Sequence, residues 1–71
     1  MNNQQTEDAI WYRNFKIWVH CSEVDGRYRY IIYSNGRRVA DTLKSSGRDY
    51  YEQSFGEAKL CVDKLIDKQK P

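Results

Sequence analysis

Two turn signals constrain the fold of this chain more than any other feature of its sequence. The dipeptides Asp25-Gly26 and Asn35-Gly36 each stand between stretches in which apolar and polar residues alternate. Such dipeptides favour the two-residue turns of β-hairpins, because both turn positions require a positive φ that Gly, Asn and Asp tolerate. The two signals together predict three consecutive antiparallel strands, over residues 15–21, 27–34 and 37–43.

The same turns predict how the strands pair. If each turn has two residues, the first sets Val19 opposite Ile32 and the second sets Ile32 opposite Val39. Side chains alternate between the two faces of a strand, so these registers agree on which residues share a face. The predicted core face comprises Phe15, Ile17, Val19, Cys21, Tyr28, Tyr30, Ile32, Val39 and Leu43. The predicted outer face comprises Lys16, Trp18, His20, Arg27, Arg29, Ile31, Tyr33, Arg38 and Ala40.

A helix is expected after the strands, from Phe55 to about Lys68. Ser54 and Glu57 have the spacing of a capping box, in which each side chain satisfies a free backbone N–H at the helix start. An apolar stripe at helical spacing then runs through Phe55, Ala58, Cys61, Val62, Leu65 and Ile66. Residues 49–53 form either a short fourth strand or an extended connection. The predicted fold class is therefore α+β: a three-stranded, or four-stranded, antiparallel meander with one C-terminal helix packed on one face.

The length of 71 residues leaves room for one small domain. We expect it to span residues 9–68, between a disordered N-terminal tail, 1–8, and a C-terminal tail, 69–71. Before the first strand, either Thr6 caps a short helical turn or Ile10 and Trp11 extend the strand. Trp11 lies four residues before Phe15, so in one continuous strand both side chains would point to the core face, which favours burial of Trp11. The chain has neither an apolar run of bilayer length nor a leader pattern, so a cytoplasmic location with reduced thiols is expected.

The sequence gives little support for catalysis. His20 and Cys21 are adjacent on a predicted strand, so they point to opposite faces and cannot form a nucleophile–base pair. Two Cys and one His lack the spacing of a metal site, and the four Gly form no phosphate-binding motif. We therefore expect a protein that is not an enzyme and has no cofactor, no metal and no small-molecule substrate.

Positive charge gathers on the predicted sheet. Residues 27–48 contain six Lys and Arg against one Asp, and the outer face also carries aromatic rings. Guanidinium groups neutralise phosphates and aromatic rings stack on bases, so this combination suits nucleic-acid binding. The candidate binding residues are Lys16, Trp18, Arg27, Arg29, Tyr33 and Arg38.

Other interpretations of the outer face remain open. Basic residues are ordinary on the solvated face of an open sheet. Exposed Trp, Tyr and Arg also favour protein interfaces, and Leu60 is either a lone exposed residue or part of a contact patch. The candidate partners are therefore DNA or RNA, or alternatively a protein partner or a second copy of the chain; no membrane partner is expected.

The predicted order of three strands and a helix that opens at Ser54-Phe55-Gly56-Glu57-Ala58 resembles the AP2-like arm-binding domain of tyrosine recombinases. The resemblance covers about 50 residues. It implies a helix behind the sheet and an exposed sheet face that enters the major groove of DNA. The whole chain also resembles short cyanobacterial proteins, which implies no activity.

Overall fold

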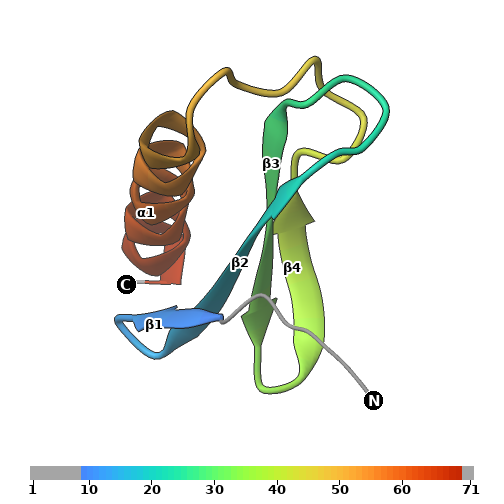
Figure 1. Ribbon diagram of the computed structural model, residues 1–71. Helices are drawn as coiled ribbons and strands as arrows, with labels where there is room; N and C mark the ends of the chain where they lie inside the picture. Colours follow the sequence, from blue (N-terminus) through green and yellow to red (C-terminus); the bar gives the residue numbers. More distant parts are fainter. Residues whose placement is uncertain (1–8, 70–71) are drawn as a thin grey trace.

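The computed structural model describes residues 9–69, so the expected tail 1–8, the capping role of Thr6 and the last two residues lie outside it. The strands follow one another in an antiparallel sheet of order β1-β2-β3-β4, and a single helix packs on one face (Figure 1). The predicted α+β class is confirmed. The elements are β1 (Ile10–Tyr12), β2 (Phe15–Cys21), β3 (Tyr28–Ser34), β4 (Arg37–Asp41) and α1 (Tyr51–Gln69).

The structure has one strand more than the three that the turns predict. This additional strand is β1, which comes first in the chain and lies at one edge of the sheet. Arg13 and Asn14 both have a positive φ, 51° and 70°, and form a two-residue turn that sets Tyr12 opposite Phe15. The turn places Trp11 opposite Lys16, on the face away from α1. The expected burial of Trp11 is therefore wrong: its side chain is 68% exposed, because parity along a strand does not continue through a tight turn.

The turn between β2 and β3 is longer than predicted. Ser22 pairs with Arg27 through a backbone hydrogen bond of 2.9 Å, so residues 23–26 form a four-residue loop. Val19 consequently lies opposite Tyr30 rather than Ile32. The register is displaced by two residues, an even number, so every side chain of these two strands keeps its predicted face.

The turn between β3 and β4 has the predicted two residues, and a bulge follows it. Tyr33 pairs with Arg38, but Ile32 pairs with Ala40, which leaves Val39 as the extra residue. An extra residue reverses the parity of the strand beyond it. Ala40 therefore packs against the core, whereas Val39 is 43% exposed.

Leu43 and Cys21 are also outside the core, contrary to prediction. Leu43 follows the end of β4 and is 41% exposed; its backbone N–H donates to the side chain of Asp41, which turns the chain away from the sheet. Cys21 is exposed because it is the last residue of β2 and borders the long loop.

The helix begins earlier than the capping box predicts. Residues 49–53 do not form a strand: Arg48 makes an isolated bridge with Tyr28, and α1 starts at Tyr51. Gln53, in the first turn, accepts a hydrogen bond of 3.2 Å from the backbone N–H of Tyr50. Ser54 is an interior helix residue and is 1% exposed, so its predicted capping role is wrong.

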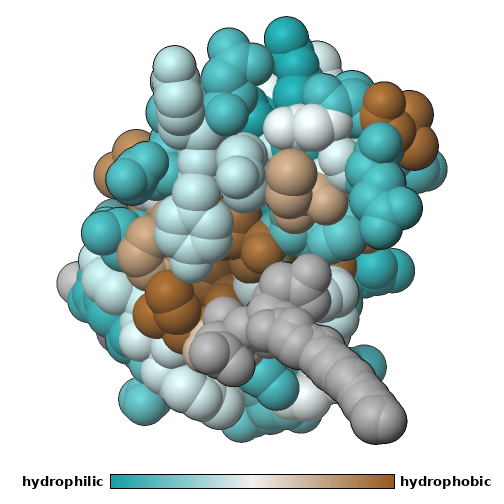
Figure 2. Space-filling model, in the orientation of Figure 1, coloured by the Kyte–Doolittle hydropathy of each residue, from teal (hydrophilic) through white to brown (hydrophobic). Residues whose placement is uncertain are grey.

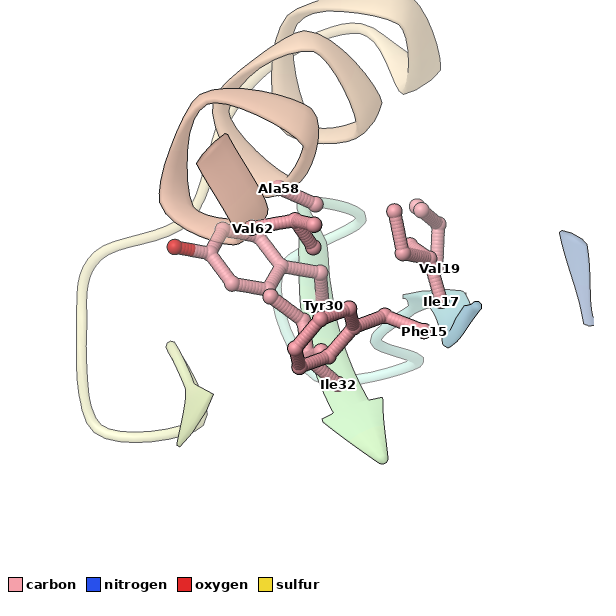
Figure 3. Packing of buried hydrophobic residues seen from close by; sticks show 7 residues of the cluster. All are labelled: Phe15, Ile17, Val19, Tyr30, Ile32, Ala58 and Val62. Carbon is pink, nitrogen blue, oxygen red and sulfur yellow. The ribbon is translucent and has the colours of Figure 1, made fainter. Parts of the chain in front are cut away.

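The core lies between α1 and the sheet (Figure 3). Ala58 and Val62 of the helix are fully buried against the strands, and the rest of the predicted stripe packs around them. Burial raises the pKa of the Tyr30 phenol to about 12. Figure 2 shows hydrophobic surface between the helix and the strands, surrounded by hydrophilic residues. The buried cluster comprises Phe15, Ile17, Val19, Tyr30, Ile32, Ala58 and Val62.

Candidate functional site

One row of side chains crosses all four strands on the face opposite α1. The pairing sets Trp11 opposite Lys16, Lys16 opposite Tyr33, and Tyr33 opposite Arg38. Directly opposed residues of neighbouring strands share a face and lie about 5 Å apart. This cross-strand row therefore alternates between aromatic and cationic side chains from one edge of the sheet to the other.

Trp18 lies in the neighbouring row, where it is paired with Ile31. Ile31 is 6% exposed although it belongs to the outer face and lies outside the main core cluster. The outer face of the sheet therefore buries one apolar side chain in the row of Trp18. The Trp18 and His20 rings also lie close together, with their centroids 5.8 Å apart. Alternation along β3 predicts the face of Ile31 correctly but does not predict that its side chain is buried.

Arg29 is near the other end of β3 and is held by its neighbours. Its guanidinium forms a two-pronged contact with the carboxylate of Asp25, at 2.7 and 3.2 Å, and its Nε donates to the backbone oxygen of Ser45 at 2.9 Å. The Arg29 hydrogen bonds keep the pKa of Asp25 well below its usual range. Arg29 therefore links the loop between β2 and β3 to the loop between β4 and α1. It is not part of the cross-strand row.

Arg27 also belongs to this loop region. Its guanidinium lies 3.6 Å from Asp49 and 3.4 Å from the backbone oxygen of Ser46. The structure thus brings Lys16, Tyr33 and Arg38 into one row with Trp18 beside them, and it separates Arg27 and Arg29 from that row.

Carboxylates compensate much of the positive charge in residues 27–48. Four of the six cations have a carboxylate within 4 Å, and three of those carboxylates come from outside this range of the chain. A charge count along the sequence misses such partners. Among the Lys and Arg residues between positions 9 and 50, Lys16, Arg37 and Lys44 have no ion pair with another described residue. The four pairs are Arg27–Asp49, Arg29–Asp25, Arg38–Asp41 and Arg48–Glu57.

A hollow of about 260 Å³ opens at the β1 end of the row. Trp11, Lys16 and Tyr33 line it, together with the turn residues Asn35 and Gly36. The hollow is therefore lined by residues of β1, β2 and β3 and by the turn that joins β3 to β4. No carboxylate is among the residues that line it.

Trp11 is the residue of this site that sequence reasoning missed. The signal that could have revealed it is Asn14, since Asn tolerates the positive φ of a tight turn. A turn at residues 13–14 would have placed Trp11 opposite Lys16. Arg13 is unusual at such a position, so the turn signal is weak compared with Asn35-Gly36.

Residues 9–69 contain no cluster of three or more His, Cys, Asp or Glu side chains that could hold a metal ion. Within residues 9–69, no helix is both long and apolar enough to cross a bilayer, since the 19 residues of α1 are too polar. Comparison of the chain with protein-family models, curated proteins and solved structures finds no match.

Proposed function

We propose that this chain is a non-enzymatic nucleic-acid-binding module whose contact surface is the sheet face opposite α1. The observation that carries the proposal is the cross-strand row, in which two aromatic and two cationic side chains alternate. Aromatic faces stack on bases, and Lys and Arg neutralise the phosphates between them. A row that offers both kinds of contact matches the repeating chemistry of a nucleic-acid chain.

The candidate residues have different roles in this proposal. Lys16, Tyr33 and Arg38 make the main contacts, and Trp18 extends the aromatic surface next to them. Arg29 contributes little to binding, because Asp25 and Ser45 already occupy its donors. Arg27 belongs to the same end of β3 and is a peripheral contact.

The free charge of this face sets the expected strength of binding. Lys16 and Arg38 are the cations of the row, and Arg38 also lies 3.6 Å from the carboxylate of Asp41. About two phosphate contacts to a single strand give a slope of about −1.4 for log K against log salt. Binding is therefore expected to be modest in affinity and moderately sensitive to salt.

The test is a titration of fluorescently labelled DNA and RNA with the protein at two salt concentrations. The double substitution Lys16→Ala with Arg38→Ala is expected to weaken binding and to flatten the salt dependence. A matched control removes two cations from exposed positions on α1, with Lys64→Ala and Lys68→Ala. Absence of binding at low salt, or equal losses in both double variants, would contradict the proposal.

The edge of β4 favours a second candidate function, self-association. Within residues 9–69, β4 ends the sheet and its outer backbone groups have no neighbouring strand, and Val39 and Leu43 expose apolar surface near this edge. A second copy of the chain could pair along this edge. Analytical ultracentrifugation at high protein concentration tests it: a dimer that Val39→Lys dissociates supports this function, and a monomer at every concentration excludes it.

A further inference from the structure

The hollow beside Trp11 has two aromatic walls. Trp11 is 68% exposed, so its ring is available to a ligand, and Tyr33 contributes a second ring from β3. The Lys16 side chain comes from the strand between them. Asn35 also lines the hollow, and an Asn side chain carries both hydrogen-bond donors and an acceptor. This arrangement offers ring stacking, one positive charge and hydrogen bonds within one small space.

The size of the hollow limits what it can hold. Its volume of about 260 Å³ is below the range of about 300–1,000 Å³ that is typical of pockets for drug-sized ligands. A single flat ring system with a polar edge fits this description better than an extended molecule. Lys16 has no ion pair among the described residues, so an anionic group attached to the ring would have a partner. A nucleobase with its phosphate has both features.

A base in a duplex cannot enter this hollow. Its faces are covered by the neighbouring base pairs, and only its edges are accessible in the grooves. A base in a single strand is free to stack on aromatic side chains. The phosphates of a duplex could contact Lys16 and Arg38, but its bases could not stack on the aromatic rings of Trp11 and Tyr33.

We infer that the sheet face binds single-stranded nucleic acid, with one base held between Trp11 and Tyr33 and its phosphate at Lys16. This inference rests on the proposed function and specifies its ligand. The strand runs along the cross-strand row, so that the next phosphates reach Arg38. Trp11 is then the residue on which the preference for single strands depends.

The experiment compares three labelled probes: an oligodeoxythymidine, the corresponding oligouridine, and the oligodeoxythymidine annealed to its complement. The single-stranded probes are expected to bind about tenfold more tightly than the duplex. Trp11→Ala should weaken single-strand binding about 5- to 150-fold and leave duplex binding unchanged. Trp11→Phe, which keeps a stacking surface, should retain most of the affinity.

Tyr50→Ala is the matched control, because Tyr50 is 66% exposed but lies at the start of the helix. Its affinity for every probe should equal that of the unsubstituted chain. Duplex binding as tight as single-strand binding, or unchanged affinity in Trp11→Ala, would overturn the inference while the proposed function stands. Failure to bind any probe would refute the proposed function itself.

Discussion

At Gly47 the loop after β4 passes close to the start of β3. A Cβ atom added there would lie 2.9 Å from the Cβ of Arg27 and 3.2 Å from the backbone oxygen of Tyr28. Gly47 also has a φ of +78°, which L-residues rarely adopt. The packing of this loop therefore depends on the absence of a side chain at one position.

Gly47→Ala is expected to destabilise the protein by about 2–4 kcal/mol, from backbone strain together with the steric overlap. Gly36→Ala is the control, since Gly36 has a φ of +79° and open space around it. That variant should lose only about 1 kcal/mol. Urea denaturation of both variants measures the difference, and equal losses would show that the loop does not pack against β3.

Val19 and Val39 test which strand positions form the core. Val19 is 7% exposed and Val39 is 43% exposed, although alternation along the sequence predicts both to be buried. Val19→Ala should lower the free energy of unfolding by about 2 kcal/mol, through lost burial and the cavity that remains. Val39→Ala should lower it by less than about 0.5 kcal/mol. The reverse order in a denaturation experiment would place the bulge of β4 elsewhere.

At the scale of the elements, local signals predicted the strands better than their connections. Asn35-Gly36 forms the expected two-residue turn, because its residues tolerate the positive φ that the turn demands. Asp25-Gly26 carries the same signal, yet it belongs to a four-residue loop in which Asp25 also holds Arg29. The bulge at Val39 depends on contacts across strands, which no short stretch of sequence contains.

The start of α1 depends on Gln53. Its side chain accepts a hydrogen bond from the backbone N–H of Tyr50, the residue that precedes the first helical turn. Gln53→Ala is expected to destabilise the protein by about 0.5–1 kcal/mol, whereas Gln53→Glu keeps the acceptor and suits the helix dipole. Thermal unfolding followed by circular dichroism compares the two. A loss in Gln53→Glu as large as in Gln53→Ala would argue against this cap.

At the scale of the whole molecule, contacts between the two ends of the described chain hold the hairpin of β1 and β2 against α1. Asp63 of the helix accepts hydrogen bonds from Arg13 at 2.7 Å and from the Tyr12 hydroxyl at 3.0 Å. The Arg13 hydrogen bond keeps the pKa of Asp63 below its usual value. The ionised carboxylate is therefore favoured in the folded state.

A lowered pKa gives this contact a defined pH dependence. Its contribution is complete above the ordinary carboxyl pKa of about 3.9 and is lost as the pH falls through the lower folded value. Asp63→Asn should reduce stability at neutral pH and make the acid limb of the stability curve shallower. Urea midpoints measured between pH about 2 and 7 test this, with Glu52→Gln as an exposed control. Identical acid limbs in Asp63→Asn and the unsubstituted chain would contradict it.

The candidate site was predictable only in part. Alternation within β2 and β3 placed Lys16, Trp18 and Tyr33 on one face, and the even displacement of the register preserved that result. The ion pair of Arg29 could not be predicted from spacing, because it depends on a loop whose length the sequence leaves open. The exposure of Trp11 depends on a turn for which Asn14 is only a weak signal.

The order of the strands also has a consequence for folding kinetics. Each strand pairs with its immediate neighbour in the chain, so all three hairpins can form by closing short loops. The helix supplies two of the seven residues of the buried cluster, and its docking brings Asp63 to Arg13 and Tyr12, which lie 50 and 51 positions earlier in the chain. We therefore expect the hairpins to form rapidly. Their apolar face remains exposed to solvent until the helix docks in a later, slower step and the core is buried.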